Sequence, residues 1–441
     1  MKKAGNILIR NARLWPAPGR PAQSGASVLI ENGRIRRTGR IRARADRTID
    51  AGGALAMPGF VQTHVHLCQT LFRGAAEDLP LLPWLRRRIW PLEAAHDEAS
   101  LRASALLACA ELIRGGTTAF LSMETVRGTA AVFDAVASTG LMGIVSHCLM
   151  DESGGYPPLA VPLPEALAEC DALRARWGGS EALRLGIAPR FALSCRTANL
   201  RVAAAYARAH GLRLHTHAAE QLPEVELVRR RTGMGNVEFL HSIGFSGPDV
   251  CLAHCVHLDP AERRLLAETG THVLHCPSAN LKLGSGLAPV TELLAEGVRV
   301  SLGADGAACN NRLDMFAEMR LAGLIQKARH GAAALPAREI VRLATEAGAR
   351  ALGWEREMGA LVPGRRANLI LLDVDQLQVV PSEEPAATVV YACDPRAVKL
   401  TMVNGAVLYE NGRLATIDEE RLRAEAKRQR ARLFRRAGVD A

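Results

Sequence analysis

Aromatic side chains are scarce in this sequence of 441 residues, where Phe, Trp and Tyr together make up 4%. Proteins that bind single-stranded nucleic acid stack the bases on such rings. The formal net charge is +10, from 55 Lys and Arg against 45 Asp and Glu. The arginines are dispersed, however, and do not form the basic stripe of a nucleic-acid interface. We therefore expect no nucleic-acid partner.

The sequence also lacks long apolar runs and paired cysteines. No apolar run approaches the roughly 20 residues of a membrane span, and Arg10 and Asn11 interrupt the apolar run that follows the basic N-terminal tip. None of the ten cysteines forms a CxxC pair, so a disulfide framework is not expected and a reducing compartment fits. These absences predict a cytoplasmic protein without a membrane partner.

Several catalytic motifs are missing. The sequence has no GxxxxGK[ST] phosphate loop and no GxSxG elbow. His96 and Glu98 form an HxE motif, but the PCxxC segment that a nucleic-acid deaminase of the Cys-ligated zinc type needs does not follow. These three classes of function are therefore not indicated.

Both ends of the chain have the texture of short β strands, and neither end alone has enough strands for a stable core. The candidate strands are Ile7–Ile9, Val28–Ile30, Asn368–Asp373, Thr388–Ala392 and Lys399–Val403, with Asn-Gly turns at 32, 404 and 411. We expect the two ends to pair into one small β-sandwich domain. The predicted domain limits are 1–57 and 360–415 for the sandwich, 58–359 for the central domain and 416–441 for an Arg-rich C-terminal helix.

Between the two ends, strand and helix patterns alternate. The eight candidate strands are Phe60–His66, Thr117–Met123, Met142–Cys148, Leu185–Phe191, Leu212–His217, Val250–Cys255, Thr271–Cys276 and Val298–Asp305. Helical stretches between them include Glu98–Arg114, Ala130–Ser138, Leu200–His210, Glu262–Thr269 and Val290–Glu296. Eight such units over this length predict an α/β protein with a closed (β/α)8 TIM barrel. An open doubly wound sheet is disfavoured because no glycine-rich loop follows the first strand.

Polar residues stand where these strands end, which is where a barrel carries its chemistry. The strand ends hold His64 and His66, Arg190, His217, His254, His275 and Asp305. Three imidazoles and a carboxylate suit one Zn²⁺ or Fe²⁺ ion with a position left for water. We assign His64, His66, His217 and Asp305 as the ligands and His215 as a packed barrel residue. The fourth strand ends in Arg190, whose side chain cannot be carboxylated and therefore cannot bridge two metal ions, so one ion is predicted.

Hydrolysis at a ring carbon that carries an amino group needs help with proton transfer. Glu220 follows the fifth strand and is predicted to protonate the neighbouring ring nitrogen. His254, together with Asp305, is predicted to take the proton of the attacking water and pass it to the leaving group. The catalytic assignment is therefore Glu220, His254 and Asp305.

Several segments resemble the amidohydrolase superfamily, in its branch of N-heterocycle deaminases and triazine hydrolases. They are PGFVQTHVHLCQTLFRG, HTHAAE, LAHCVHL, HCPSANLKLGSGLAPV and LGADGAACNNRLDMFAEMRLA. The branch includes deaminases of methylthioadenosine, S-adenosylhomocysteine and 5'-deoxyadenosine, and guanine deaminase. The resemblance implies one divalent metal ion, usually zinc or iron, a small N-heterocyclic substrate and a homo-oligomer.

The resemblance also implies substrate-binding residues. In the adenosine-type deaminases a glutamate after strand one holds the ribose hydroxyls, which places Glu93 in that role, and Trp84 as a wall of the pocket. Arg190 stands where those enzymes commonly have histidine. Arg190 and Gln69 are similar instead to the arginine and glutamine that contact the purine in guanine deaminase, and Glu220 completes the substrate-binding set.

The leading hypothesis is hydrolytic deamination of an aminopurine, with an adenosine-type nucleoside ahead of a free base. A guanine-type base deaminase and an s-triazine hydrolase that releases chloride or an alkylamine are the alternatives. A catalytically inactive binding scaffold is disfavoured, because all four candidate ligands and both candidate proton-transfer residues are present.

Overall fold

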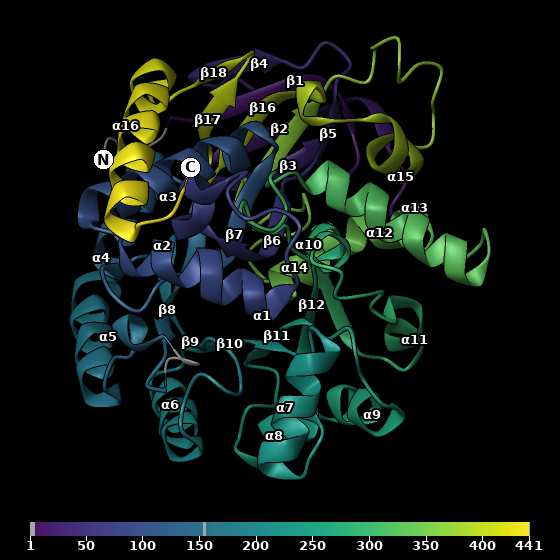
Figure 1. Ribbon diagram of the computed structural model, residues 1–441. Helices are drawn as coiled ribbons and strands as arrows, with labels where there is room; N and C mark the ends of the chain where they lie inside the picture. The colour runs from purple at the N-terminus through teal and green to yellow at the C-terminus, as the bar shows by residue number, and fades with distance from the viewer. Residues whose placement is uncertain (1–4, 153–155, 441) are drawn as a thin grey trace.

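The computed structural model describes residues 5–152 and 156–440 and contains two sheets (Figure 1). One is the wall of a barrel, and the other joins strands from both chain ends. Within the described residues no helix combines the length and the apolar character needed to cross a lipid bilayer.

The barrel consists of parallel strands in chain order. Its strands are β6 (Phe60–His66), β7 (Thr117–Met123), β8 (Met142–Leu149), β9 (Leu183–Pro189), β10 (Arg213–Ala218), β11 (Val250–His254), β12 (His272–His275), β13 (Arg299–Leu302) and the short β14 (Asp305–Gly306). Each strand pairs with the next up to β13, and β14, just after β13, pairs back with β6 through Asp305 and Val65. The ring is thereby closed, and the predicted barrel is confirmed.

Helices follow the strands and surround them, so that α5, α6, α9 and α11 lie outside the strands in Figure 1. The helices are α1 (Leu81–Trp84), α2 (Trp90–Ala94), α3 (Glu98–Arg114), α4 (Thr129–Thr139), α5 (Leu163–Trp177), α6 (Thr197–Ala209), α7 (Leu222–Thr232), α8 (Asn236–Ser242), α9 (Pro260–Thr269), α10 (Pro277–Lys282), α11 (Val290–Ala295), α12 (Met315–His330), α13 (Ala337–Ala344), α14 (Glu346–Ala351), α15 (Pro385–Ala387) and α16 (Glu419–Ala437). Local chemistry starts several of them. Asp97 and Asp259, for example, each accept a backbone N–H three residues ahead and cap α3 and α9.

The second sheet contains β1 (Ile7–Leu14), β2 (Gln23–Glu31), β3 (Arg34–Gly39), β4 (Arg47–Asp50), β5 (Leu55–Pro58), β15 (Leu369–Leu372), β16 (Val398–Val403), β17 (Ala406–Glu410) and β18 (Arg413–Leu414). The two chain ends meet where β5 pairs antiparallel with β15. A bridge between Arg34 and Arg366 brings β3 back to the segment before β15. The sheet therefore wraps around its own apolar core, which includes Ile9, Val28 and Met402. The predicted pairing of the two ends is confirmed, and the domain limits stay a prediction.

The prediction of a strand at Thr388–Ala392 is wrong, because this segment forms a π-helical turn that continues α15. Glu384 caps α15 through the backbone N–H of Ala387, and Pro385 stands at the first helical position. The hydroxyl of Thr388 also donates to the carbonyl of Glu384. The β-branched run of Thr and Val suggested a strand, but the start signal before it and burial of Val389 and Val390 favour the helical turn.

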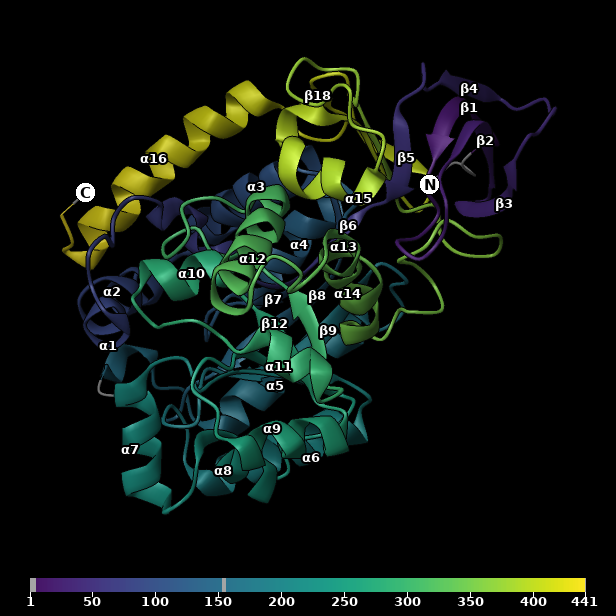
Figure 2. The ribbon, with the colours of Figure 1, turned by 90° about the vertical axis from the view of Figure 1, so that its right-hand side faces the viewer.

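The C-terminal helix α16 lies along α3 and reaches α2 at its far end (Figure 2). Arg430 donates to the carbonyls of Leu71 and Arg73. Arg436 donates to the carbonyl of Ala95 at 2.8 Å. The helix thus contacts both ends of the segment between β6 and α3, which carries three of the predicted substrate-binding residues.

Candidate active site and metal centre

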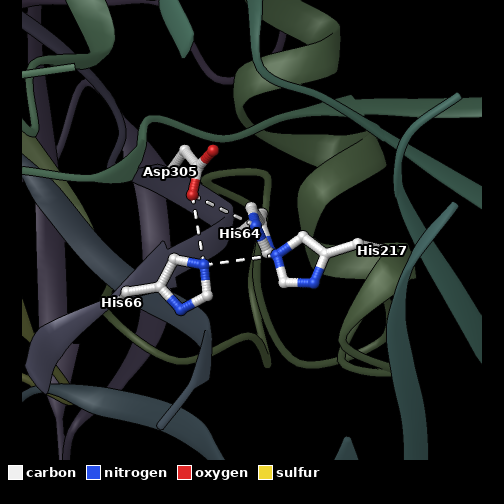
Figure 3. Close-up of side chains that lie close together, drawn as sticks. All are labelled: His64, His66, His217 and Asp305. Carbon is white, nitrogen blue, oxygen red and sulfur yellow. Dashed lines mark hydrogen bonds and ion pairs between the residues drawn. The ribbon is translucent and has the colours of Figure 1, made fainter. Parts of the chain in front are cut away.

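The four predicted metal ligands lie together at the barrel mouth (Figure 3). Their ligand atoms all lie within 4.8 Å of one another. Asp305 Oδ1 is 3.3 Å from His64 Nε2 and 3.2 Å from His66 Nε2, and His66 Nε2 is 3.3 Å from His217 Nε2. Alternation along β6 turns His64 and His66 to the same side of the strand, and barrel closure brings Asp305 beside them.

The hydrogen bonds behind these imidazoles leave their Nε2 atoms facing one another. His66 Nδ1 donates to the carbonyl of Met123 at 2.8 Å, and His217 Nδ1 donates to the carbonyl of Arg190 at 2.6 Å. His64 Nδ1 is 2.8 Å from His215 Nε2. His64 Nε2 is buried without a hydrogen-bond partner. Three imidazole nitrogens that face one another beside one carboxylate oxygen fit a divalent cation. Hydrogen bonds at the other ring nitrogen, as described here, are typical of metal-binding histidines.

The pKa shifts of His64 and Asp305 agree with a cation site. Burial lowers the pKa of the His64 imidazole to about 4. Burial would raise the pKa of Asp305, but His64 and His66 outweigh it and hold that pKa well below its ordinary value. Neutral imidazoles and an ionised carboxylate are the forms that bind a metal ion.

Unusual backbone conformations mark the same strand ends. Ala219, His254 and Asp305 have φ angles of 52°, 73° and 63°, in the left-handed region. Non-glycine residues rarely adopt this conformation, and where they do it is often at a functional site. Here it turns the chain sharply at the ends of β10 and β11 and at the start of β14, where the polar side chains of the mouth stand.

The two predicted proton-transfer residues lie beside the metal cluster. His254 Nε2 is 3.5 Å from Glu220 Oε2 and 3.7 Å from Asp305 Oδ2. His254 Nδ1 lies 2.8 Å from Asn280 Oδ1, which accepts its proton and leaves Nε2 facing the two carboxyls. Burial raises the pKa of Glu220 to about 7. Burial lowers the pKa of His254, but Glu220 and Asp305 outweigh it and the pKa is raised.

A cavity opens onto this cluster. Its lining is His66, Gln69, Leu81, Trp84, Leu85, Arg190, Phe191, His217, Glu220, Glu224, His254, Leu283 and Asp305. Of the predicted substrate-binding residues, Gln69, Trp84, Arg190 and Glu220 line the cavity, and Trp84 Nε1 is buried without a partner. Glu93 is not part of the lining. It lies behind Gln69 and Arg190 and bonds to both.

Three further residues make contacts at the site that were not predicted from the sequence. Glu224 is buried and accepts the backbone N–H of Glu220 at 2.9 Å, which fixes the loop that carries Glu220. Asn280 orients His254, and His215 contacts His64 as well as packing in the barrel. Asn280 lies within the SANLKLG segment, so the sequence offered a signal. His275 ends β12, but neither nitrogen of its buried imidazole has a hydrogen-bond partner among the described residues.

Comparisons with known proteins show which family the chain resembles. The profile described as "Amidohydrolase family" matches residues 55–408. The chain is 39% identical to a 5-methylthioadenosine/S-adenosylhomocysteine deaminase of Syntrophobacter fumaroxidans, over 96% of this chain and 98% of the relative. It is also 39% identical to a 5'-deoxyadenosine deaminase of Methanothermobacter thermautotrophicus, over 94% of this chain and 96% of the relative.

Solved structures show the same architecture. An adenosine deaminase from Xanthomonas campestris with bound zinc has a TM-score of 0.92 and 30% identity, covering 97% of this chain and 98% of its own. A guanine deaminase from E. coli has a TM-score of 0.82 and 26% identity, covering 92% of this chain and 99% of its own. The similarity extends over nearly the whole chain, so it includes both the barrel and the second sheet, termed the end sheet because strands from both chain ends form it.

Proposed function

This chain belongs to the amidohydrolase family, and on that premise we propose that it catalyses the hydrolytic deamination of an aminopurine, with an adenosine-type nucleoside as the leading substrate. In this reaction water adds to the ring carbon that bears the amino group, and ammonia leaves, so the C–N bond is exchanged for C=O. The candidate substrates are 5'-deoxyadenosine, methylthioadenosine and S-adenosylhomocysteine. The two relatives, which are named as deaminases of these compounds, support this choice.

The observation that carries the proposal is the meeting of four Nε2 and carboxylate ligand atoms with Glu220 and His254 on one cavity. We propose that His64, His66, His217 and Asp305 hold one divalent ion, zinc rather than iron. When bound, such an ion supplies a water nucleophile near neutral pH. The zinc in the similar adenosine deaminase structure supports this assignment.

The chain's own residues handle the protons. A carboxyl group with a pKa of about 7 is protonated in a large share of the molecules at neutral pH and can then donate that proton from Oε2 or Oε1 to a ring nitrogen, which is the role we assign to Glu220. His254 takes a proton at Nε2, because Asn280 occupies its Nδ1 hydrogen. The raised pKa of His254 favours its protonated form, which can then donate to the departing amine.

The cavity walls exclude water and orient the ring. Trp84, Leu81, Leu85 and Phe191 supply apolar walls, and Gln69 and Arg190 supply polar groups. Backbone N–H of Leu81 donates to Gln221 Oε1 at 3.2 Å, which ties the start of α1 to the loop after β10 across the mouth. A flat heterocycle fits such a site, because one face needs apolar contact and the edges need hydrogen bonds.

Arg190 and Gln69 on the cavity wall favour a second candidate function, deamination of a guanine-type base. Like the guanine deaminase structure to which the chain is similar, such an enzyme would take a free base as substrate. We further propose that the protein acts in the cytoplasm, which the ten buried free cysteines support. The homo-oligomeric state and the lack of a nucleic-acid partner stay predictions.

The test is ammonia release from a panel of 5'-deoxyadenosine, methylthioadenosine, S-adenosylhomocysteine, adenosine, guanine and 8-oxoguanine. Chloride release from a chlorotriazine is measured in parallel. We expect the highest kcat/KM with one of the first three compounds. Turnover of guanine alone would favour the second candidate, chloride release would favour a triazine hydrolase, and silence on every compound would exclude the proposed reaction.

A further inference from the structure

Glu93 forms a buried network with two residues of the cavity wall. Its Oε2 lies 2.5 Å from Arg190 Nη1, and its Oε1 accepts from Arg190 Nη2 at 3.0 Å and from Gln69 Nε2 at 2.8 Å. Glu93 and Arg190 are each 3% exposed and Gln69 is 0% exposed. One carboxylate in α2 therefore joins the end of β9 to the turn after β6.

The network fixes which hydrogen-bonding atoms of Arg190 and Gln69 are left without a partner in Glu93. A guanidinium has five N–H donors, and Arg190 uses two of them on Glu93. A carboxylate only accepts, so Gln69 must turn its amide nitrogen toward Glu93 and leave Oε1 at the other end. That oxygen is buried without a partner and lies against Gly306, where an added Cβ would come within 2.2 Å of it.

The same contacts occupy Glu93. Burial would raise the pKa of its carboxyl, but Arg190 outweighs burial and the pKa is lowered, so Glu93 stays ionised within a neutral pair. Bidentate Arg–carboxylate pairs are strong and geometrically specific. Glu93 is buried behind Arg190 and Gln69 and does not line the cavity, so a substrate hydroxyl could reach it only if one of these two side chains moved.

We propose that Glu93 is a positioning residue that holds Arg190 and Gln69 against the substrate ring, and that it does not itself bind the ribose hydroxyls. This inference rests on the proposed function. It gives Glu93 the same importance for a nucleoside as for a free base, because both present the ring to Arg190 and Gln69. A ribose-binding glutamate would matter for the nucleoside alone.

The kinetic test uses Glu93→Gln with 5'-deoxyadenosine as substrate and adenine as substrate or competitive inhibitor. The amide would set an N–H against a donor of Arg190 or Gln69, so one of them must move. We expect kcat/KM for 5'-deoxyadenosine and the affinity for adenine both to fall about tenfold or more. A loss confined to 5'-deoxyadenosine, with adenine unaffected, would overturn the proposal.

A second variant pair tests whether Glu93 acts through Arg190. Arg190→Gln should lose activity, and addition of Glu93→Gln to it should cost little more, because the residue being positioned is already gone. Independent roles would instead multiply the two losses. Glu111→Gln is the matched control, since it removes the carboxylate partner of Arg73 outside the cavity. Glu93→Asp keeps the charge one methylene shorter and replaces Glu93→Gln if that variant does not fold.

A crystal structure of Glu93→Gln separates this inference from the proposed function. We expect the Arg190 guanidinium to leave its position on the cavity wall, and an unchanged Arg190 would overturn the inference whatever the activity. If the wild-type enzyme deaminates none of the panel, the proposed function fails, while the position of Arg190 still decides whether Glu93 holds it.

Discussion

Glu220 is a carboxyl group at the cavity whose pKa is raised by burial to about 7. It lies within 3.5 Å of His254 and within 3.4 Å of the hydroxyl of Ser285, and Glu224 fixes its backbone. None of these partners is an arginine or lysine, and burial outweighs the imidazole of His254, so the pKa of Glu220 stays raised. A group held in this way can give up a proton and recover it within one turnover.

Replacement of Glu220 by Gln should therefore stop catalysis and leave the metal centre intact. We expect kcat to fall about 10²- to 10⁴-fold, because a positioned acid contributes about that much. Turnover and metal content are measured on the same preparation. Glu226→Gln on the exposed face of α7 is the control and should keep wild-type turnover. Full activity in Glu220→Gln would show that another group protonates the ring.

His215 illustrates how a residue assigned to packing can act on the ion. It is fully buried, and its Nε2 lies 2.8 Å from His64 Nδ1. For His64 to present the lone pair of Nε2, its Nδ1 must carry the hydrogen, which His215 then accepts. His215 thus fixes the tautomer of a candidate ligand.

We predict that His215→Leu weakens metal affinity about 10- to 100-fold, the usual effect of losing an outer partner of a ligand. Zinc affinity is measured by competition with a chelator of known affinity. His272→Leu makes the same change at the opposite end of the barrel, where the residue is equally buried and belongs to no ligand cluster. Equal zinc affinity in the wild type and His215→Leu would limit His215 to packing.

The polar residues at the strand ends could be placed at the barrel mouth from the sequence, because each barrel strand can be recognised from its local pattern of residues. His64, His66, His217 and Asp305 stand together once the barrel closes, and the order of the strands suffices to place them. The network of Glu93, Arg190 and Gln69 could not be predicted, because its members come from three elements and their side-chain directions depend on packing. The resemblance implied one substrate site for all three residues, whereas the structure places Glu93 behind the other two and outside the cavity lining.

At the scale of elements, the barrel strands carried the clearest signal. Thr117–Met123 and Phe60–His66 have the predicted limits, since buried parallel strands read as continuous apolar runs. The eighth predicted strand differs from its predicted limits, because it forms two strands. β13 ends at Leu302, and β14 begins at Asp305 and pairs with β6. At Thr388–Ala392 the predicted strand is wrong. Its β-branched residues suggested a strand, but the helix that begins just before this segment continues through it.

Helix α12 carries a second carboxyl group with an unusual pKa. Burial raises the pKa of Glu318 to about 7. Its Oε2 accepts from the backbone N–H of Ser278 at 3.1 Å, and its Oε1 accepts from Asn310 Nδ2 at 2.8 Å. Glu318 therefore ties α12 to α10 and to the loop after Asp305, and its ionisation should affect how firmly these elements pack.

The sign of the pH effect follows from the raised pKa. An unfolded chain loses the proton of a glutamate near pH 4.5, whereas the folded protein keeps it on Glu318 until about pH 7. Between these two pH values the folded state thus binds more protons than the unfolded state. The contribution of Glu318 to stability is therefore present below about pH 4.5 and is lost as the pH rises to about 7.

We predict that Glu318→Gln removes this loss. Between pH 5 and pH 7.5 the wild type should lose about 2 to 3 kcal/mol relative to the variant, at about 1.4 kcal/mol for each pH unit. The free energy of unfolding is measured by urea denaturation across that range. Glu98→Gln replaces an exposed carboxyl at the start of α3 and serves as the control. Parallel curves for wild type and Glu318→Gln would contradict the prediction.

At the scale of the whole molecule, the C-terminal helix connects the end sheet to the cavity. Figure 2 shows α16 extending from the region of β18 to α2, along the outside of the barrel. Two of its arginines hold backbone carbonyls at the two ends of the segment 67–95, which includes Gln69, Trp84 and Glu93. The cavity wall is thus supported by residues more than 300 positions away in the sequence, a relation that no local pattern could predict.

We predict that the double variant Arg430→Gln, Arg436→Gln raises KM several-fold with a smaller change in kcat, because the wall contributed by the segment 67–95 loosens while the metal cluster does not. The lost hydrogen bonds should also lower the free energy of unfolding by about 1 to 3 kcal/mol. Steady-state kinetics, zinc content and urea denaturation are compared with Arg432→Gln, an exposed arginine of the same helix. If the double variant lost zinc together with kcat and kept its KM, α16 would support the metal centre instead, and the segment that lines the cavity would be stable without it.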